Sequence, residues 1–313
     1  MSAPAISRRK IDQLKKILKS CTLCPRRCLV DRTKGERGFC GLADDVRVSR
    51  ALPHHGEEPP ISGTRGAGTI FLSSCNLKCI YCQNYQLSRE GLGNRMDVEG
   101  LADIMVELEK KNCHNIEPVT PTPQLPQVME ALAFARRRGL SLPLVYNCGG
   151  YEDADILKLV QGMVDIYLPD FKYGREAGAV VLSGVKDYAA HAVSSIKEMV
   201  RQVGEEIILE GGVAKKGAII RHLVLPGFTS NSIDVLKLIK RHISLSVPLS
   251  IMSQYTPMPA VREHPQLGRR ITKSEYELVV NYALDMGFET IFTQDVDERS
   301  LAPDFSKDDP FEW

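Results

Sequence analysis

The pattern of apolar and polar positions predicts an alternation of strands and helices from residue 68 onward. Short apolar runs bounded by glycine, proline or polar residues indicate buried strands, and longer segments with apolar residues three or four apart indicate helices. We expect strands near 68–74, 115–119, 142–147, 164–169, 218–225 and 248–253, and helices near 97–112, 125–138, 152–161, 186–203, 231–243 and 272–286. This alternation is typical of a parallel sheet or barrel.

Six strand–helix repeats are too few for a full eight-fold barrel. They predict an α/β fold with a partial (β/α)6 TIM-like barrel and a small N-terminal cysteine-rich metal-binding segment. The expected division is residues 1–60 for the N-terminal helix and cysteine segment, 61–294 for the barrel and 295–313 for an extended tail. Weaker signals at 206–211 and 291–292 indicate additional short strands.

The N-terminal part carries two further features. Residues 8–19 read as a short basic helix whose apolar residues share one face, which favours packing on the rest of the protein. Residues 51–68 are rich in proline and glycine and are expected to form a linker and loop. Four titratable residues in this loop are either solvated or reach the mouth of the site, and they are His54, His55, Glu57 and Glu58.

Three cysteines follow the first predicted strand with the spacing C-x3-C-x2-C. They are Cys75, Cys79 and Cys82, and Tyr81 stands directly before the last of them. A structural zinc site normally has four protein ligands, whereas each iron of a [4Fe–4S] cube needs one ligand from outside the cube. Three thiolates therefore leave one iron open to a substrate or cofactor. A zinc knuckle or a disulfide framework is the alternative for this motif.

Four more cysteines stand within twenty residues near the N-terminus, and they are Cys21, Cys24, Cys28 and Cys40. Four thiolates suit zinc, a mononuclear iron or a second iron–sulfur cluster, and the sequence does not choose among them. The glycines at 35, 38 and 41 would let the backbone wrap closely around such a metal. Free thiols or disulfides are the alternative, which a reducing compartment disfavours.

Composition and charge favour a cytoplasmic protein. The formal net charge is +1, which points to neither nucleic acid nor a membrane as a partner. Residues 1–60 hold 13 Lys/Arg and 7 Asp/Glu, or +6, and the remainder holds 27 and 32, or −5, so the N-terminal part is either a solvated basic surface or faces an acidic partner. No apolar run reaches the length of a membrane span, and the N-terminus has no apolar signal core. Nine cysteines in such a chain favour metal binding over disulfides.

The three-cysteine motif, with an aromatic residue before its last cysteine, resembles the signature of the radical S-adenosylmethionine (SAM) superfamily. Over nearly its whole length the chain is similar to the glycyl-radical-activase branch, and more narrowly to the pyruvate formate-lyase activating enzyme-like proteins. Residues 21–28, 63–71, 75–84, 170–172 and 221–227 carry this resemblance. It implies that the open iron binds SAM, that the reduced cluster cleaves SAM to methionine and a 5′-deoxyadenosyl radical, and that this radical abstracts hydrogen from a substrate under anaerobic conditions.

The resemblance also implies roles for individual residues. The three motif cysteines would ligate the [4Fe–4S] cluster, and Tyr81 would lie against the adenine of SAM. Asp170 and Lys172 match an Asp-x-Lys of activases that reaches SAM, because charged groups form strong hydrogen bonds with hydroxyls and a carboxylate. Further cofactor contacts are expected at Asn84, Thr120, Thr122, Asn147, Glu152, Arg221 and His222.

Two features depart from the activase pattern. Activases usually carry Gly-Gly-Glu after the second strand, where this chain has Thr120-Pro121-Thr122-Pro123, so hydroxyls and carbonyls would have to receive the SAM amino group. Activases with extra ferredoxin-like clusters insert them after the signature, whereas the four-cysteine group precedes it here. That group would anchor the N-terminal part over the barrel mouth, relay an electron or contact substrate. Cys113 and Cys148 are expected to be buried thiols, with Cys148 as a minority candidate for a hydrogen donor in the cavity.

Three functions remain open at this point. The first is a radical SAM oxidoreductase that receives electrons from a donor such as flavodoxin or ferredoxin and acts on a glycyl radical enzyme or another protein or peptide. The second is the same chemistry on a small molecule or tRNA, where a narrow, roofed mouth would favour a small substrate and an open lateral groove a protein loop. The third is a non-enzymatic iron–sulfur or zinc protein, which needs a fourth protein ligand beside the motif cysteines.

Overall fold

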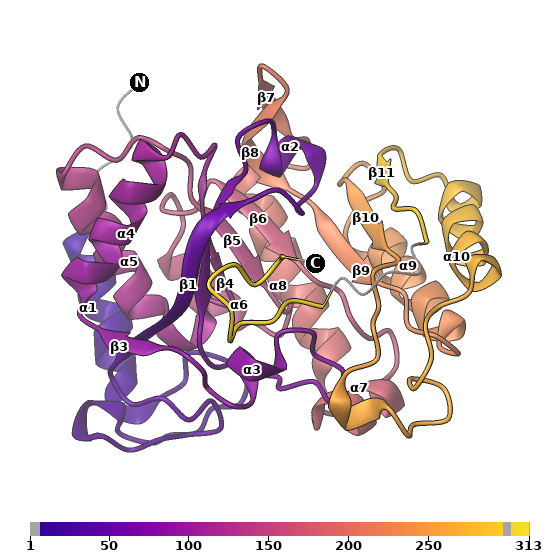
Figure 1. Cartoon of the computed structure of the whole chain (residues 1–313), viewed down its shortest axis with the longest axis horizontal. Helices are drawn as coiled ribbons and strands as arrows, with labels where there is room; N and C mark the ends of the chain where they lie inside the picture. Colours follow the sequence, from indigo (N-terminus) through magenta and orange to yellow (C-terminus); the bar gives the residue numbers. More distant parts are fainter. Residues whose placement is uncertain (1–6, 297–301, 313) are drawn as a thin grey trace.

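The computed structural model describes residues 7–296 and 302–312 and shows a mixed α/β protein built on two sheets (Figure 1). The strand order is β3-β1-β2-β4-β5-β6-β8-β7 in the larger sheet and β11-β10-β9 in the smaller one. The strands are β1 Val46–His54, β2 Ala67–Leu72, β3 Asn94–Met96, β4 Ile116–Val119, β5 Val145–Cys148, β6 Ile166–Pro169, β7 Ile208–Glu210, β8 Val213–Ala218, β9 Ile220–Leu223, β10 Leu249–Met252 and β11 Ile291–Phe292. The α-helices are α1 Arg8–Ile17, α2 Pro59–Ser62, α3 Tyr85–Ser88, α4 Val98–Lys110, α5 Leu125–Arg137, α6 Ala154–Leu159, α7 Glu176–Ser183, α8 Tyr188–Val203, α9 Thr229–His242 and α10 Lys273–Met286.

Parallel pairing runs through most of both sheets. β2, β4, β5 and β6 lie in succession and parallel, β8 is parallel to β6, and β10 is parallel to both β9 and β11. The two sheets meet where Asp170, just after β6, pairs with Arg221 of β9. Only Ile219 separates β8 from β9. The six predicted strands and the two shorter ones are therefore confirmed, whereas the closure of the strands into a partial barrel stays an interpretation.

Local hydrogen bonding and apolar spacing together explain why the helices form where they do. α4 buries Leu101, Met105 and Leu108, the face that the sequence predicts. The helix begins after Asp97, whose side chain accepts a hydrogen bond from the backbone N–H of Gly100 at 2.7 Å. This bond satisfies one of the backbone donors that a helix start leaves unpaired, and it fixes the first turn.

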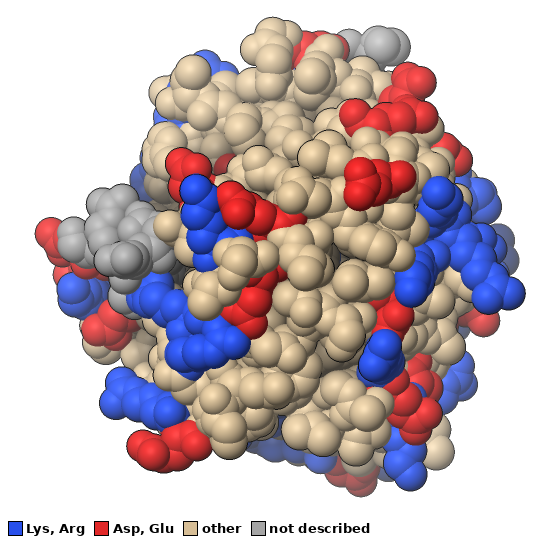
Figure 2. Space-filling view, turned by 90° about the vertical axis from the view of Figure 1, so that its right-hand side faces the viewer, with Lys and Arg blue, Asp and Glu red and all other residues tan. Residues whose placement is uncertain are grey.

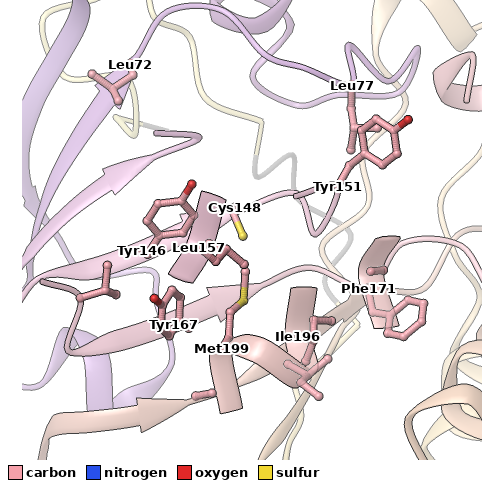
Figure 3. Close-up of a cluster of buried hydrophobic side chains, with 14 of the residues drawn as sticks. Leu72, Leu77, Tyr146, Cys148, Tyr151, Leu157, Tyr167, Phe171, Ile196 and Met199 are labelled. Atoms are coloured by element: carbon pink, nitrogen blue, oxygen red, sulfur yellow. The ribbon is translucent and has the colours of Figure 1, made fainter. Parts of the chain in front are cut away.

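A cluster of aromatic and aliphatic side chains fills the space between the sheet and α8 (Figure 3). Tyr146 of β5 and Tyr167 of β6 are fully buried, with ring centroids 5.8 Å apart. Ile196 and Met199 of α8 belong to the same core. Figure 3 shows Cys148, the last residue of β5, with its sulfur directed toward this cluster. The core therefore holds the carboxyl end of β5 in place.

The prediction of a linker and loop over residues 51–68 is wrong at two places. β1 extends to His54 and pairs antiparallel with β2, and α2 occupies Pro59–Ser62. Pro53 lies opposite Gly68 in this pairing. β3 pairs only with residues 46–48 of β1, so Pro53 lies on a stretch with a described strand on one side only. Proline, which has no backbone N–H to donate, is tolerated at such an edge, and this is why its presence misled the sequence analysis.

The N-terminal helix packs as predicted. Ile11, Leu14 and Leu18 are buried, and α1 lies against α5 and α6 at the left of Figure 1. Lys15 forms an ion pair with Glu130 of α5 at 2.5 Å. These contacts do not test the predicted domain boundary at residue 60. β1, on the N-terminal side of that boundary, is part of the large sheet.

One face of the molecule illustrates the mixed character of the surface. On the side that carries α10, the centre is largely uncharged and side chains of both signs lie around it (Figure 2). Within the described ranges, no helix combines the length and the hydropathy needed to cross a bilayer.

Gly150, just after β5, sets the distance between the loops that follow β5 and β6. Its φ is +75°, and a Cβ built there would lie 2.0 Å from the carbonyl oxygen of Asp170. Gly162 has a similar φ of +81° but has no atom within 4 Å of the same position. The two glycines therefore share the backbone conformation and differ in the space available.

Gly150→Ala is expected to lower the free energy of unfolding by about 2–5 kcal/mol, because it combines left-handed backbone strain with a steric clash. Gly162→Ala, the matched control, should lose only the strain, about 1–2 kcal/mol. Urea unfolding followed by circular dichroism measures both. Equal losses in the two variants would contradict the close packing of the β5 and β6 loops.

Candidate functional site

The loop from Cys75 to Cys82 follows β2 and places its three thiols on the wall of one cavity of about 450 Å³. Each sulfur accepts a hydrogen bond from a different part of the chain. The donors are the backbone N–H of Leu77 to Cys75 at 3.3 Å, the hydroxyl of Ser183 to Cys79 at 3.0 Å and the hydroxyl of Ser88 to Cys82 at 3.3 Å. Donors aimed at sulfur stabilise a thiolate, so this loop is suited to hold a cation.

The three thiols also influence one another electrostatically. Burial, followed by the nearby Cys79, raises the pKa of Cys75 to about 12 and raises the pKa of Cys82 above its ordinary value. Without a cation, Cys75 and Cys82 are therefore neutral, and a bound metal would be needed to hold them as thiolates. In the described part of the chain, no group of three or more His, Cys, Asp or Glu residues is arranged to hold a metal ion. The fit to an iron–sulfur cluster thus rests on the donor chemistry and the shared cavity.

The carboxyl ends of several strands meet around this cavity. Of the predicted cluster ligands and cofactor contacts, ten line it, and they are Cys75, Cys79, Tyr81, Cys82, Asn84, Thr120, Asn147, Asp170, Lys172 and Arg221. They come from the ends of β2, β4, β5 and β6 and from β9. The fold therefore brings polar residues from distant segments of the chain together at one site. The role of each residue stays a prediction.

Asp170 and Lys172 form an ion pair at 2.5 Å. Burial alone would lower the pKa of Lys172, but the carboxylate of Asp170 and the nearby Cys79 raise it above its ordinary value, so the ammonium group stays charged. The hydroxyl of Tyr188 accepts a hydrogen bond from the backbone N–H of Lys172 at 2.8 Å and lies 2.8 Å from the carbonyl oxygen of Gly149. Tyr188 thus ties the loops after β5 and β6 together. Sequence reasoning missed it, because a tyrosine at the start of a helix carries no signal of this role.

Three of the predicted cofactor contacts do not line the cavity. Thr122 donates a hydrogen bond to the buried Glu152 at 2.6 Å, so both belong to a packed polar pair next to the N-terminal segment. His222 is fully buried between the carbonyl oxygen of Phe171 and the hydroxyl of Ser232, at 2.7 and 2.8 Å. Burial lowers the pKa of His222 to about 4, so the imidazole is neutral and bridges two elements.

A group of charged residues forms the wall opposite the cysteine loop. Arg221 donates from Nε to Glu58 at 2.9 Å and from Nη2 to both Glu57 and Glu58. Burial alone would lower the pKa of Arg221, but these two carboxylates raise it well above its ordinary value. His54, Glu57 and Glu58 therefore reach the cavity, which the sequence left as one of two alternatives for them, whereas His55 is not among the lining residues. The guanidinium of Arg221 is already engaged within the protein.

Glu117 of β4 is a second group that sequence reasoning missed. It is fully buried and accepts hydrogen bonds from Thr69 at 3.0 Å and from Asn147 at 2.8 Å. Burial and the nearby Glu57 raise its pKa well above the ordinary value. An acidic residue inside the apolar run of a predicted strand was the available signal, since such a residue needs partners within the fold.

Part of the expected C-terminal tail closes one side of the cavity. Phe305 is buried against Phe71 of β2, with ring centroids 5.0 Å apart. Phe311 lines the cavity, and its ring centroid lies 4.2 Å from that of His54. Arg50 of β1 donates two hydrogen bonds to the carbonyl oxygen of Lys307, at 3.0 and 2.8 Å. Residues 302–312 therefore form a side wall rather than a free extension.

The four N-terminal cysteines line a second, much smaller cavity of about 20 Å³. Cys28 accepts a hydrogen bond from the backbone N–H of Phe39 at 3.3 Å. Burial, with smaller contributions from Cys40 and Cys21, raises the pKa of Cys24 to about 12, which indicates that these sulfurs lie near one another. Arg27 and Leu29, on either side of Cys28, have φ of 41° and 58°, a conformation that non-glycine residues adopt only when their surroundings fix it. The donor set suits a thiolate-bound metal, but closed coordination is not seen.

All nine cysteines are free thiols within the described residues. Cys113 is buried away from both groups, as expected. Cys148 is buried at the end of β5 and also lines the cavity. Burial raises its pKa well above the ordinary value, so it is a neutral thiol there.

The fold and the site together define a mixed α/β protein in which a three-cysteine loop faces a polar cavity at the ends of parallel strands. The chain is 30% identical over 290 residues to the uncharacterized protein MJ0674 of Methanocaldococcus jannaschii, which covers 88% of this chain and 79% of that protein. The chain belongs to the same family as MJ0674. It is also 22% identical over 304 residues to the uncharacterized protein MJ0808 of the same organism, with 88% of this chain and 81% of that protein covered. No family model matches the chain.

Two solved structures resemble the chain at low identity. One is Streptococcus suis SuiB bound to its precursor peptide SuiA, with a TM-score of 0.48 and 12% identity, covering 71% of this chain and 47% of that one. The other is anSMEcpe with bound AdoMet and a Cp18Cys peptide, with a TM-score of 0.46 and 13% identity, covering 70% and 60%. The match spans less than two thirds of each of those chains, and at TM-scores below 0.5 it supports no argument about this one.

Glu152→Gln is expected to reduce the pH dependence of stability. Burial raises the pKa of Glu152 to about 8 in the folded chain from an ordinary value of 4.5, so the folded state holds the proton more tightly than the unfolded state does. This contribution to stability is complete below about pH 4.5 and is lost at roughly 1.4 kcal/mol per pH unit as the pH rises toward 8. Urea unfolding at several pH values in this range measures the difference. Parallel pH profiles for wild type and variant would contradict a protonated Glu152.

Proposed function

We propose that this protein is a radical SAM enzyme whose cluster is held by Cys75, Cys79 and Cys82. The observation that carries the proposal is that three thiols from one eight-residue loop, with the C-x3-C-x2-C spacing, share a cavity with the Asp170–Lys172 ion pair. Three thiolates suit a [4Fe–4S] cluster with one open iron. We interpret the parallel strands as a partial (β/α)6 barrel with the cysteine-rich segment beside it.

A [4Fe–4S] cluster held by these three cysteines would supply, once reduced by an external donor such as flavodoxin or ferredoxin, the one electron needed to split SAM into methionine and a 5′-deoxyadenosyl radical. Lys172 supplies a fixed positive charge to the methionyl carboxylate, and Asp170 accepts hydrogen bonds from ribose hydroxyls. Tyr81, buried between Tyr173 and Tyr255 with ring centroids 6.4 Å away on each side, offers an aromatic surface for adenine.

The cavity residues then confine the reaction. Abstraction of a hydrogen atom from the substrate would give 5′-deoxyadenosine and leave the unpaired electron on the substrate. The apolar part of the wall, which includes Leu77, Leu223 and Met252, limits the groups that could react in place of the substrate. Thr120 lines the cavity where activases carry Gly-Gly-Glu, and Thr122 is held by Glu152, so we assign the SAM amino group to Thr120.

A matched pair of cysteine variants tests this proposal. The anaerobically reconstituted and reduced protein should convert SAM to 5′-deoxyadenosine, measured by chromatography and mass spectrometry. Cys75→Ala should lower the rate by at least about 100-fold. Loss of a residue that only hydrogen-bonds to a metal ligand typically costs about 10–100-fold, and loss of the ligand itself should cost more. Cys113→Ala, which removes a buried thiol outside both groups, should keep activity. No product above the Cys75→Ala background in the wild type would refute the proposal and favour a binding or redox-sensing protein.

A small-molecule substrate is favoured over a protein loop by the position of residues 302–312. Phe311 and His54 line the cavity side by side, and the buried Phe305 anchors the segment that carries Phe311, so we take this wall to limit the room for an extended protein segment. Fully burying a phenylalanine side chain stabilises a contact by about 1.5–3 kcal/mol, so the wall does not open without cost. Activation of a glycyl radical partner is therefore the less favoured form of the proposal.

An extract of cells grown in deuterated medium, separated by ultrafiltration, distinguishes the two substrate classes. Deuterium should enter 5′-deoxyadenosine when the filtrate of small molecules is supplied and not when the retained proteins are. Phe311→Ala should lower this transfer about ten-fold or more, because the wall loses a buried contact with the substrate space. Leu284→Ala, an exposed position on α10, is the control and should have no effect. Transfer from the protein fraction alone would reverse the assignment.

A further inference from the structure

The two groups of cysteines touch each other. The hydroxyl of Ser74, the residue before the three-cysteine loop, donates a hydrogen bond to the carbonyl oxygen of Cys40 at 2.6 Å. Within the loop, the carbonyl oxygen of Asn76 accepts a hydrogen bond from Nε of Arg26 at 3.0 Å. Arg26 lies between Cys24 and Cys28 in the sequence. The N-terminal group therefore contacts the start of the loop at two places, Ser74 and Asn76.

Arg26 uses its whole guanidinium for this contact. Besides Asn76, it donates from Nη1 to the carbonyl oxygen of Gly184 at 2.9 Å and from Nη2 to that of Ser183 at 3.0 Å. The ring of Phe39 covers the guanidinium, with its centroid 3.7 Å from Cζ. The planar guanidinium carries N–H donors on three nitrogens and can therefore bind these three carbonyl oxygens at once. A lysine ammonium has no such planar set of donors.

The carbonyls that Arg26 binds belong to the segment that supports the middle thiol. The hydroxyl of Ser183 donates to the sulfur of Cys79 at 3.0 Å, and the backbone N–H of Ile80 donates to the carbonyl oxygen of Leu182 at 2.9 Å. Arg26 thus bridges the loop and the end of α7, and it fixes both partners of the Cys79 contact. Loss of this bridge would free the loop from its support.

Backbone strain in both groups indicates why such support is needed. Ser74 and Lys78 in the loop have φ of 85° and 55°, and Arg27 and Leu29 in the N-terminal group are also left-handed. Non-glycine residues hold this conformation only where their surroundings over-determine it. In the loop, the contacts from Arg26 and Cys40 are part of those surroundings. In the N-terminal group, a metal on the four thiolates would play that part and would also hold Arg26 in place.

We propose that Arg26 couples the two cysteine groups: a metal bound by Cys21, Cys24, Cys28 and Cys40 fixes Arg26, and Arg26 fixes the Cys75–Cys82 loop in the shape that receives its cluster. Arg26 is then a positioning residue. The inference rests on the proposed function in taking this loop as the cluster site. Its consequence is that loss of the N-terminal metal weakens the second site, even though no ligand of the second site has changed.

Hydrogen exchange on the full chain tests this coupling without iron or SAM. In a Cys75→Ser, Cys79→Ser, Cys82→Ser background, the N-terminal group is the only cysteine cluster left for added zinc. Zinc content and the exchange of backbone amides over residues 74–82 are measured by mass spectrometry, with and without zinc. Arg26→Gln is compared with Arg27→Gln. The Arg27 control alters the adjacent residue, whose 2.9 Å ion pair with Asp153 is exposed on the arginine side and therefore weak.

Zinc should slow exchange over residues 74–82 by about ten-fold or more in the background and in Arg27→Gln, and should have no such effect in Arg26→Gln, because hydrogen bonds from a charged donor are among the stronger ones. Arg26→Lys should recover only part of the effect. Equal slowing in the Arg26 and Arg27 variants would overturn the proposal, as would zinc that binds without slowing exchange. Loss of zinc binding in both Arg26 variants would also overturn it, since Arg26 would then act within its own group.

A second readout on the iron-loaded chain connects this coupling to the proposed function. Arg26→Gln should require about ten-fold more SAM than Arg27→Gln to produce the same change in the electron paramagnetic resonance spectrum of the reduced protein. Equal requirements would count against the coupling. A wild type with no spectral response to SAM would refute the radical SAM proposal alone, because the zinc experiment contains neither iron nor SAM.

Discussion

Three buried sulfur atoms within one eight-residue loop are the constraint on which the rest of this site depends. Thiolates placed side by side in a low-dielectric interior repel one another strongly, and burial already disfavours the charged form. The directions of the pKa shifts at Cys75 and Cys82 express this, since both are raised. Without a cation, contacts from outside the loop therefore add to its few internal hydrogen bonds in keeping its shape. Those contacts come from α3, from the end of α7 and from the N-terminal cysteine segment.

The outer contacts explain why distant parts of the chain are packed around so short a loop. Ser88 and Ser183 donate to two of the sulfurs from two segments that lie far apart in the sequence, α3 and the end of α7. The backbone of Ser74 and Lys78 is left-handed, so the loop would relax if these neighbours withdrew. The parallel sheet contributes by fixing where β2 ends, and the buried cluster around Tyr146 and Met199 fixes the neighbouring end of β5. The architecture thus prepares the donor set before any metal is bound.

Much of this could be predicted from the sequence, because the signals were local. Fully buried strands such as β2 are continuous apolar runs, and the three-cysteine spacing is a short motif. The errors arise where tertiary pairing decides. Pro53 looks like a loop residue, yet it lies in β1, and Glu117, inside a correctly predicted strand, was missed as a buried acid whose carboxylate Thr69 and Asn147 satisfy. Neither pairing can be read from a single stretch of chain, because each joins residues from different strands.

The partners of Arg221 also come from a distant segment of the chain, and they change how this site residue is interpreted. Its place after a predicted strand favours a contact to a ligand carboxylate, and it does line the cavity. However, Glu57 and Glu58 occupy its guanidinium, and a buried guanidinium that lost both carboxylates would cost far more than one extra contact gains. Its role is therefore to hold the segment around residues 54–58 against the sheet, close to where Phe311 meets His54. The charge that remains available to an anionic group at the cysteine end of the cavity is that of Lys172, which is kept protonated by Asp170 and can exchange that partner without leaving a buried cation alone. Within the proposed function, Lys172 is therefore the residue that we assign to a ligand carboxylate, and Arg221 is assigned to the structure of the cavity wall.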